Sequence, residues 1–470
     1  MIYQHLFDRV KEPAVVRAAL IGSGSFGAPV ATQARLLPRL DLRVIADANI
    51  AAARSAFLAA GAAEEDIAIC DSPQAARRAM ESGKWVVAED GLVLMDLPLH
   101  VIVTAVGVPE AAARYAHEAL RHGKHVVCVD KEADSVVGPF LKRLADRAGV
   151  VFTTDDGDQP GLVMGLVSWA RALGFEVLCA GHFHELLYSP QQSTLTTSGG
   201  GRSLLIPPAS RGAFEPIPEG GASHYAEARR RATADWEALQ QNGDSLAHLA
   251  VTANGTGLVP DASGVHFPLA RLQELPEVLC PQEDGGILHA RGVVELPTVL
   301  RTEGAPSVDG GVFVIVSNAD ERSRQLMIAK GLMTNRAGSA MLIYRPHHLC
   351  GAETAISILC AGLLRIPTGA STLLPVADLS ATAGRDFAAG EIPSGPGRSR
   401  TDPSLRPAVI PAAPLADDNP LPFFMLETNR LAVDVPKGTV ITRRMVVPPP
   451  DSALWSLRQQ QDETFLTARE

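Results

Sequence analysis

The chain has 470 residues, a hydrophobic fraction of 46% and a formal net charge of −10. This length predicts two or three domains with a buried core, and the negative charge argues against a nucleic-acid-binding surface. The longest apolar runs are only strand-length, and residues 1–11 carry charges without an apolar signal core. We therefore expect neither a membrane span nor a signal peptide. The six cysteines are dispersed without a CxxC pair, which favours a reducing cytoplasm.

The N-terminal stretch combines a strand, a glycine turn, a helix, a second strand and an acid. Residues 15–21 form a mainly aliphatic strand that leads into Gly22-Ser23-Gly24-Ser25-Phe26-Gly27. A helical pattern over residues 29–37 and a strand over residues 40–46 follow, and Asp47 comes directly after them. Because both strands and the acid are in place, we interpret the motif as a dinucleotide site rather than a glycine-rich turn.

Each glycine of this motif has its own physical role. Gly22 permits a tight turn, Gly24 lets the backbone approach a pyrophosphate, and Gly27 lets the helix pack close to the strand. The free N–H groups at the helix start then hold the phosphates. Asp47 can accept hydrogen bonds from the adenosine ribose hydroxyls, and its charge would repel a 2′-phosphate. We therefore expect NAD as the cofactor, with NADP as the alternative.

The chain continues to alternate strands with helices up to residue 155. Strands are predicted over residues 67–70, 100–106, 125–129 and 150–154, and helices over residues 51–60, from Pro73, over 109–121 and over 140–147. This pattern predicts an α/β fold with a Rossmann-type, doubly wound parallel sheet over residues 1–155. Ligands bind such sheets beyond the carboxyl ends of the strands. We therefore expect one cofactor crevice, lined by residues that follow strands: Gly22, Ser23, Gly24, Ser25, Phe26, Gly27, Asp47, Ala105, Val106, Gly107 and Lys131.

An acidic turn, Asp155-Asp156-Gly157-Asp158-Gln159-Pro160-Gly161, opens the next part of the chain. Three acids in four residues fit either a solvated turn with an Asp cap or a metal site, so the need for a divalent metal stays open. A helix (162–173) and a strand (176–180) follow. After them, His182 and His184 alternate by two and share one face of an extended segment.

Residues 156–372 have the mixed pattern of an α+β substrate domain. Residues 189–221 are rich in Ser, Thr, Gly and Pro, and we expect them to form a lid or a partly disordered insertion. A charged helix over 225–241 carries Arg229, Arg230 and Arg231, which form a solvated face or reach an anion. Helices are expected over 245–253 and 353–363, and strands over 292–296, 311–316 and 340–345.

The last part of the chain, residues 373–470, is rich in proline and has few helical patterns. Two stretches of similar form, 385–392 and 433–440, each read as a short strand, a turn on glycine and a second strand. A small all-β module is expected there.

Several separate motifs resemble one family of proteins. They are Val129-Asp130-Lys131-Glu132-Ala133-Asp134, Asp156-Gly157-Asp158-Gln159-Pro160-Gly161, Ala253-Asn254-Gly255-Thr256-Gly257, Tyr344-Arg345-Pro346-His347-His348-Leu349-Cys350 and the tail over residues 431–446. Together they resemble the homoserine-dehydrogenase-like oxidoreductases with a C-terminal SAF (β-clip) domain. The best-known branch of this family resembles a 1-deoxy-D-xylulose 5-phosphate reductoisomerase in activity but not in fold. The resemblance covers nearly the whole chain.

The resemblance implies a nicotinamide cofactor and several site residues. It implies that Lys131 lies near the hydride face of the cofactor, with an acid from the acidic turn (Asp158) and a basic residue after the next strand. This chain departs from the reductoisomerase-like branch by having His184 where that branch has lysine and His248 where a glutamate is expected. Such a change replaces a permanent charge by a group that titrates near neutrality.

The same motifs provide candidates for substrate binding. These are Asn254, Arg345 and His348. Arg345 and His348, with the neighbouring His347, fit the binding of a substrate anion and fit equally well the junction between two domains.

The chemistry of hydride transfer agrees with this set of residues. Reduction of a carbonyl leaves an alkoxide, which needs a cationic neighbour and a proton donor. Lys131 can supply the charge, Asp158 can orient the substrate hydroxyl, and His184, with His182 beside it, can carry the proton. The alternatives are a surface lysine paired with an adjacent acid, an exposed histidine face, and a metal cluster of His182, His184 and Asp158.

The sequence therefore predicts an NAD(P)H-dependent oxidoreductase that acts on a small, hydroxylated and anionic carbon substrate, such as a sugar acid, a polyol or a sugar phosphate. One alternative is a reductoisomerase-like enzyme that makes 2-C-methyl-D-erythritol 4-phosphate. The other is a non-catalytic, nucleotide-sensing binding protein. We expect a cytoplasmic homo-oligomer whose partner is a small molecule, with no nucleic acid or membrane partner.

Overall fold

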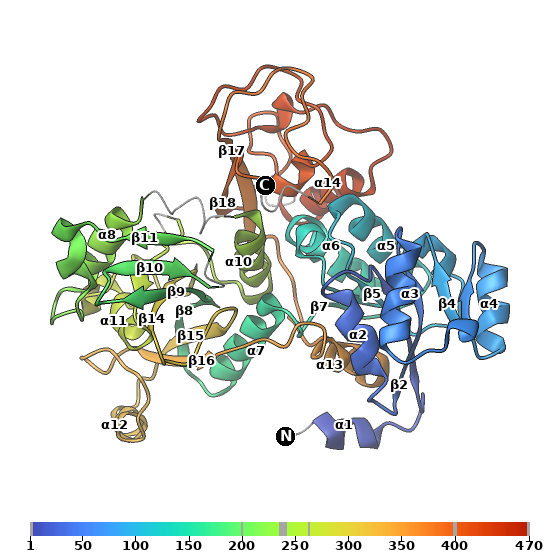
Figure 1. The fold of residues 1–470 in the computed structure, drawn as a ribbon, viewed down its shortest axis with the longest axis horizontal. Helices are drawn as coiled ribbons and strands as arrows, with labels where there is room; N and C mark the ends of the chain where they lie inside the picture. The colour runs from blue at the N-terminus through green and yellow to red at the C-terminus, as the bar shows by residue number, and fades with distance from the viewer. Residues whose placement is uncertain (1–2, 199–200, 235–241, 262–263, 398–401, 468–470) are drawn as a thin grey trace.

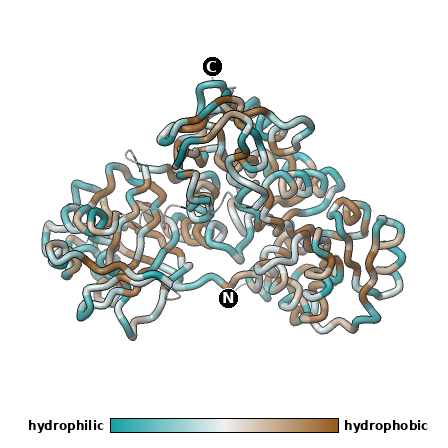
Figure 2. Tube along the Cα trace, turned by 45° about the horizontal axis from the view of Figure 1, so that its top comes forward, coloured by the Kyte–Doolittle hydropathy of each residue, from teal (hydrophilic) through white to brown (hydrophobic). Residues whose placement is uncertain are grey.

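The computed structural model describes residues 3–198, 201–234, 242–261, 264–397 and 402–467. Figure 1 shows a parallel sheet with its helices in blue and cyan, a second group of strands in green and yellow, and an orange-to-red C-terminal part that lies against both. Hydrophobic stretches, brown in Figure 2, run through the interior of each part. No helix among the described residues is both long and apolar enough to cross a membrane.

The N-terminal part contains the predicted Rossmann-type sheet. Its seven strands are all parallel, in the order β3-β4-β2-β1-β5-β6-β7. They are β1 (Val16–Ile21), β2 (Leu40–Ala46), β3 (Ile67–Ile69), β4 (Trp85–Ala88), β5 (Val101–Thr104), β6 (His125–Cys128) and β7 (Phe152–Thr154). Strand β4 was not predicted, because its four residues are all buried and give no alternating pattern of apolar and polar residues. The chain order reverses beside β1, which puts the ligand crevice of such a sheet at the end of that strand.

Helices cover both faces of this sheet. They are α2 (Gly27–Ala34), α3 (Ile50–Ala59), α4 (Pro73–Glu81), α5 (Pro109–Arg121) and α6 (Lys131–Ala148), and α1 (Tyr3–Arg9) precedes them. Ser72 caps α4 as its sequence position predicts, since its side chain accepts a hydrogen bond from the N–H of Ala75. The expected start of α6 near residue 140 is wrong, because Pro139 lies inside the helix. Lys131 is therefore the first residue of a helix rather than the last residue of a strand.

The second part holds two further sheets. The four-stranded sheet has the order β13-β8-β15-β16 and the five-stranded sheet the order β11-β10-β9-β14-β12. Their strands are β8 (Glu176–His182), β9 (His184–Ser189), β10 (Thr194–Thr197), β11 (Ser203–Leu205), β12 (Leu269–Ala270), β13 (Val293–Glu295), β14 (Thr298–Thr302), β15 (Val312–Ser317) and β16 (Met341–Arg345). The helices of this part are α7 (Gln159–Ala172), α8 (Ala222–Ala232), α10 (Gly243–Thr256), α11 (Leu275–Val278) and α12 (Glu321–Ala329). Of these, α7 packs on β8 and β15, and α10 packs on α7.

The segment over residues 189–221 is more regular than its composition predicts. Strands β10 and β11 form an antiparallel pair at the edge of the five-stranded sheet. Leu195, Ile206 and Phe214 are buried in a small core of their own. The composition rich in Ser, Thr, Gly and Pro thus hides a small core, because three separate apolar residues are enough to pack it. A closing motion of this segment stays a prediction.

The arginines of α8 pair with acids. Arg229 is fully buried, and its Nη1 lies 2.7 Å from Oε2 of Glu274. Arg230 and Arg231 both pair with Glu227. Arg229 is thus a core ion pair rather than part of a solvated face or an anion-binding group. The rest of the predicted helix, residues 235–241, lies outside the described residues.

The helical segment after β16 packs on the first sheet. It consists of α13 (Thr354–Leu359) and a π-turn over Cys360–Leu364, and it contacts α2, β1 and β6. Its apolar residues share a core with β1 and β2. Although this segment falls within the predicted substrate domain of residues 156–372, it completes the nucleotide-binding part. The chain therefore crosses between the two parts twice.

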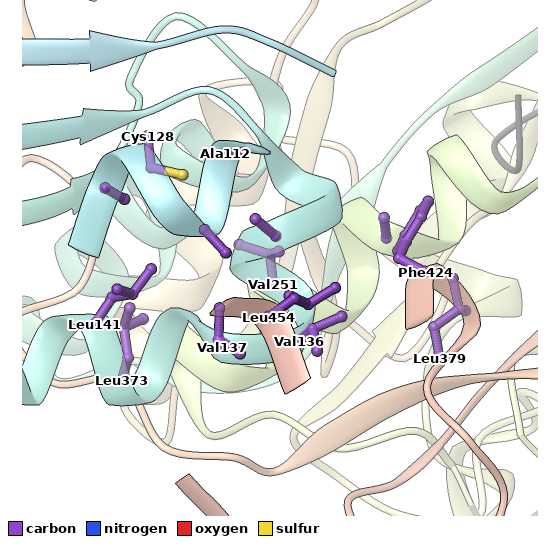
Figure 3. Packing of buried hydrophobic residues seen from close by; sticks show 14 of the residues in the cluster. Ala112, Cys128, Val136, Val137, Leu141, Val251, Leu373, Leu379, Phe424 and Leu454 are labelled. Atoms are coloured by element: carbon purple, nitrogen blue, oxygen red, sulfur yellow. The ribbon is translucent and has the colours of Figure 1, made fainter. Parts of the chain in front are cut away.

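The C-terminal part combines an antiparallel pair with a helix. Strands β17 (Ala377–Ala383) and β18 (Leu405–Pro411) pair, and short bridges extend them. The helix α14 (Ala453–Phe465) packs on α5 and α6, which an all-β prediction did not foresee. Figure 3 shows Val136 of α6, Val251 of α10, Leu379 of β17 and Leu454 of α14 in one cluster. A core shared by all three parts holds them together. The predicted boundaries at 155 and 372, and an SAF-like architecture, stay predictions.

Candidate active site

The glycine loop has the geometry that its sequence predicts. Gly22 has a φ of +95°, and a Cβ there would lie 2.2 Å from the carbonyl oxygen of Ala105. A Cβ on Gly27 would lie 2.1 Å from the carbonyl oxygen of Gly22. A Cβ on Gly24, in contrast, would have no atom within 4 Å. The outer glycines are thus required by packing, and the middle one faces open space, as the approach of a pyrophosphate requires.

Asp47 lies against this loop. Its Oδ2 accepts hydrogen bonds from the backbone N–H and the hydroxyl of Ser23, both at 2.7 Å, and its Oδ1 accepts the N–H of Asn49 at 2.8 Å. These contacts fix the carboxylate at the end of β2, beside the turn that would hold the phosphates. The residues present therefore fit a dinucleotide.

The ends of β5 and β6 are tied together on the other side of β1. The N–H of Gly107 donates to Oδ1 of Asp130 at 2.6 Å. Ala105 is next to Gly22, and Gly351, on the loop after β16, lies close to the carbonyl oxygen of Phe26. The glycine loop thus has the β5 end on one side and the loop from the second part on the other.

Lys131 lies between the two main parts of the molecule. Its side chain is only 14% exposed, and its Nζ lies 3.0 Å from Oδ1 of Asp244 on α10 and 4.0 Å from Oε1 of Glu132. Burial alone would lower the pKa of Lys131, but the carboxylates of Asp158, Glu132 and Asp244 outweigh it and hold the pKa above its usual value. A surface lysine is therefore excluded, and the buried ammonium stays charged.

Asp158 is held by three different groups. It caps α7, with its Oδ1 accepting the N–H of Gln159 at 2.8 Å, and its Oδ2 lies 3.3 Å from Nε2 of His248. Burial would raise the pKa of Asp158, but His248 and then Lys131 outweigh burial and hold that pKa well below its usual range. Asp158 is therefore a carboxylate at every physiological pH.

His182 and His184 flank the turn between β8 and β9. The His182 ring lies 5.4 Å from the His248 ring and 5.9 Å from the His184 ring, centre to centre. Neither ring nitrogen of His182 has a hydrogen-bond partner in the described part of the chain, although the ring is buried. Nε2 of His184 lies 2.8 Å from Oγ of Ser245. An unpartnered buried imidazole costs free energy unless a ligand satisfies it.

Burial lowers the pKa of both candidate proton carriers, His182 and His184. Burial, with the neighbouring His248 and His184, holds the pKa of His182 well below its usual value. Burial also lowers the pKa of His184, although Asp309 partly opposes it. Burial thus favours the neutral form of both rings, and proton transfer by His184 stays a prediction.

Helix α10 supplies the residues that sequence reasoning did not place in the site. Asp244 and His248 are four positions apart and share one face of the helix, which puts one beside Lys131 and the other beside Asp158. The i, i+4 spacing of Asp244 and His248 was the signal in the sequence that could have identified this shared helix face. The sequence gives no indication of which surface this face meets. The crevice cluster is the group of Lys131, Asp158, His182, His184, Asp244 and His248.

The metal cluster considered for His182, His184 and Asp158 is not formed. Within the described ranges, the three residues whose ligand atoms lie within 4.8 Å of one another are Asp261, His266 and His289. The ring centres of His182 and His184 are 5.9 Å apart, and Oδ2 of Asp158 lies against Nε2 of His248.

The three predicted substrate residues have different positions. Asn254 is buried, and its Oδ1 accepts the N–H groups of Val376 at 2.8 Å and Ala377 at 2.9 Å, so it anchors the C-terminal part. Arg345 forms an ion pair with Glu353. Asn254 thus has a structural contact in this fold and Arg345 is paired with an acid, and the substrate roles of both stay predictions.

His348 is the candidate that faces the crevice cluster. Its Nδ1 donates to the carbonyl oxygen of Gly310 at 2.6 Å, and its Nε2 lies 3.0 Å from Sγ of Cys350. The Cys350 hydrogen bond, the charge of Asp158 and the Gly310 carbonyl raise the pKa of His348 above its usual value against the effect of burial. His348 therefore adds positive charge near Asp158 at neutral pH.

One buried acid beside this site makes stability depend on pH. Burial raises the pKa of Asp134 to about 7, against about 3.9 in an unfolded chain. The folded state keeps a proton that the unfolded state has released, so the contribution of Asp134 to the free energy of unfolding falls as pH rises from about 4 to 7.

Asp134→Asn should therefore stabilise the protein at pH 8 relative to the wild type, by about 1–3 kcal/mol, and far less at pH 5. The amide is neutral at both values. Urea unfolding at the two pH values measures the difference. Asp146→Asn, on the exposed end of the same helix, is the control and should show no such change. Equal effects of Asp134→Asn at both pH values would contradict the shifted pKa.

Comparison with known families agrees with this geometry. Residues 157–354 match the family model for the catalytic domain of the oxidoreductase DRL. The matched stretch contains Asp158, His182, His184, Asp244 and His248. The matched stretch is less than half of the chain, and together with the glycine loop at the ends of parallel strands it supports an NAD(P)-dependent oxidoreductase. No curated protein matches the chain.

Solved structures with similar folds are distant in sequence. One from Archaeoglobus fulgidus, provisionally described as a homoserine dehydrogenase, is 15% identical, and the match covers 74% of this chain and 100% of that one with a TM-score of 0.36. The WlbA dehydrogenase of Bordetella pertussis, solved with NADH and UDP-GlcNAcA, is 17% identical over 38% of this chain and 48% of that one, with a TM-score of 0.25.

The myo-inositol dehydrogenase of Lactobacillus casei, solved with NAD(H) and myo-inositol, is 15% identical over 37% of this chain and 47% of that one, with a TM-score of 0.26. The chain spans about half of the length of the first such structures, for example 46% of an oxidoreductase from Bacillus subtilis. At these identities only a general fold is shared, and the substrate has to be argued from the crevice cluster itself.

Proposed function

We propose that this protein is an NAD-dependent oxidoreductase that interconverts a hydroxyl and a carbonyl group on a small, hydroxylated, anionic carbon compound. The observation that supports this most strongly is the buried, charged Lys131 beside the Asp158–His248 pair, two strands away from the glycine loop. Buried ionisable groups whose pKa is strongly perturbed by charged neighbours cluster at binding and catalytic sites.

In the proposed chemistry, the residues of the crevice cluster have different roles. A bound nicotinamide would supply or accept the hydride at the carbon. The ammonium of Lys131 donates a hydrogen bond to the reacting oxygen, stabilises the negative charge that develops on it, and provides the proton that completes the alcohol. Asp158 and Asp244 hold that ammonium in position. Because burial keeps His182 and His184 neutral, we assign to them the binding of further substrate hydroxyls.

The charge of the substrate is inferred from the cations around the cluster. Lys131 and His348 are both positively charged at neutral pH, and His348 stands close enough to Asp158 for the two charges to interact. An anionic group on the substrate would compensate His348, and the hydroxyl groups would satisfy the unpartnered nitrogens of His182. Sugar acids and polyol phosphates have both features.

A spectroscopic screen tests the proposal. Sugar acids and polyol phosphates are incubated with the protein and NAD, and their carbonyl forms with NADH, while the absorbance at 340 nm is followed. We expect a change for an anionic polyol and none for its uncharged counterpart. Turnover of uncharged, singly hydroxylated alcohols alone would contradict the proposed substrate class.

The position of Asp47 predicts the choice of cofactor. NADH should bind at least about tenfold more tightly than NADPH, because the carboxylate repels a 2′-phosphate at close range. Asp47→Ala should weaken NADH binding and remove most of this preference. Fluorescence titration at constant salt measures both affinities. Tighter binding of NADPH by the wild type would show that the acid does not select the cofactor.

A reductoisomerase-like reaction is the second candidate. It is supported by the resemblance of the motifs around Lys131 and Asp158, whereas the family match over residues 157–354 supports only an oxidoreductase. The resemblance implies a lysine where this chain has His184 and a glutamate where it has His248. Loss of the permanent positive charge of the lysine weakens the binding of a phosphate. Incubation with 1-deoxy-D-xylulose 5-phosphate and either reduced cofactor, followed by mass spectrometry, distinguishes the two. Formation of 2-C-methyl-D-erythritol 4-phosphate would select this second candidate.

Two further expectations accompany the proposal. A homo-oligomer is expected, which light scattering after gel filtration measures directly. The SAF-like C-terminal part, which shares its core with α6 and α10, is proposed to brace the crevice rather than to act separately.

A further inference from the structure

A second group of ligating side chains lies away from the crevice cluster. Asp261 and His266 stand on the loop after α10, and His289 stands on the loop before β13. Their ligand atoms all lie within 4.8 Å of one another. Oδ2 of Asp261 lies 3.4 Å from Nε2 of His266 and 3.1 Å from Nδ1 of His289. Bonds of about 2.0–2.2 Å to a tetrahedral ion put neighbouring ligand atoms about 3.3–3.6 Å apart.

A second layer of groups orients these three ligands. Nδ1 of His266 lies 2.5 Å from Oε1 of Glu295, which is fully buried on β13. The Glu295 carboxylate also accepts the backbone N–H of His266. With Nδ1 directed at Glu295, the other ring nitrogen of His266, Nε2, faces Asp261. A carboxylate–histidine pair of this kind is the usual support of a metal-binding histidine.

Asp261 is fixed just as firmly. Its Oδ2 accepts the backbone N–H of His289 at 2.8 Å, and its Oδ1 accepts the N–H of Ala290 at 3.1 Å. The two imidazoles approach the same oxygen, and their planes are nearly parallel, 10° apart. This convergence places two nitrogens and one oxygen around a common point without any rearrangement of the loops.

The donor atoms of this buried group suit a metal cation. The side chains of Asp261 and Glu295 are both fully buried, so two carboxylates lie close together in an apolar part of the second domain. Buried carboxylates are stable only when they are paired or when they coordinate a metal. Two imidazoles and a carboxylate suit zinc, whereas magnesium and calcium prefer oxygen ligands alone.

We infer that Asp261, His266 and His289 bind one zinc ion, with Glu295 as the acceptor that orients His266. His289 is 45% exposed, which leaves the fourth position open to water. The ion joins the loop that leaves α10 to the loop that enters β13, and it therefore stabilises the frame from which Asp244 and His248 project.

The zinc site is separate from the proposed active site. Glu295 pairs with Gly181 on β8, next to His182. Val294 lies in the core that includes residues of α7 and α10, whereas Val293 lies in the core on the other side of the sheet. Because side chains alternate along a strand, Glu295 points away from α7, and the ion lies across the sheet from His182.

Metal analysis of the untagged protein tests the inference. We expect about one zinc per chain after purification, its removal by chelation at mildly acidic pH, and its return on addition of zinc chloride. Zinc should raise the melting temperature of the chelated protein by about 3–5 °C. Magnesium should produce no such change. Less than a tenth of an equivalent after reconstitution, without a thermal shift, would overturn the site, and one equivalent of another metal would overturn the assignment to zinc.

Variants separate this site from adventitious binding. His289→Gln changes a half-exposed side chain, so the fold should persist while the zinc content falls at least tenfold. His266→Gln should behave in the same way if it folds. His122→Gln is the matched control, because His122 also faces a carboxylate, Nε2 lying 3.6 Å from Oδ1 of Asp96, but is not part of the three-ligand group. Zinc retained by His289→Gln, or lost from His122→Gln, would contradict the proposed ligands.

Discussion

Lys131→Ala is expected to lower kcat by about 10²-fold while NADH binding changes little. The ammonium is assigned to the charge that develops on the substrate oxygen, so its removal raises the barrier without removing a contact to the adenosine end of the cofactor. Steady-state kinetics on a substrate found in the 340 nm screen, together with NADH titration, measure the two effects.

Two variants control this experiment. Lys142→Ala removes another buried lysine side chain from the same helix. Lys142 pairs with Asp146, toward the other end of the helix from Lys131. We expect kcat of this variant to stay within about twofold of the wild-type value. Lys131→Arg keeps the charge but not the geometry, and it should recover only part of kcat. If Lys131→Ala keeps the wild-type kcat, the lysine is structural and the proposed chemistry is wrong.

Asp158→Asn is expected to lower kcat by about 10²- to 10³-fold, with a second effect on pH dependence. The carboxylate holds Lys131 and His248 at once, so its loss misplaces the proton donor and removes the charge that keeps the ammonium in place. The pKa of Lys131 should then fall, and the high-pH limb of the rate profile should move to lower pH.

The matched control is Asp156→Asn, two residues away in the same turn. Burial, followed by the charge of Glu353, raises the pKa of Asp156 to about 6, so its side chain is already partly protonated near neutral pH. Its replacement should leave kcat within a few-fold of the wild type. An Asp156 variant as damaged as the Asp158 variant would show that the whole turn, rather than one carboxylate, is required.

The nucleotide-binding part was largely predictable because its signals are local. Three features carry the prediction: the glycine spacing, the aliphatic strand before it and the position of Asp47. Each has one physical explanation, and that explanation involves only residues within about forty positions along the chain. Gly22 and Gly27 are required by contacts with their own loop and with Ala105, which are properties of any unit with this sequence order. Likewise, Ser72 and Pro73 define the start of α4 without help from the rest of the fold.

The remainder of the site depends on contacts between distant segments. Lys131 was expected to end a strand, but tertiary packing extends α6 back through Pro139 and turns the lysine toward α10. Nothing in the sequence near residue 248 says that this histidine meets Asp158, because ninety residues and a sheet separate the two. Asn254 belongs to a matching motif and yet anchors the C-terminal part.

Burial is the property that sequence reasoning estimated least well. His184 was expected to titrate near neutrality, but the surrounding core lowers its pKa. Arg229, in a run of three arginines, was expected at the surface and lies in a buried pair with Glu274. In both cases residue type predicts the chemistry available, and packing decides whether water can reach it.

Transfer of deuterium from labelled NADH is the most direct test of the central claim, that hydride moves between cofactor and substrate beside Lys131. The carbonyl form of a substrate found in the screen is reduced with NADH carrying deuterium at either face of C4, and the product is examined by mass spectrometry. We expect one face alone to deliver deuterium to carbon, with a rate that falls about 10²-fold in Lys131→Ala. A product without deuterium, or equal rates in the two proteins, would contradict the account.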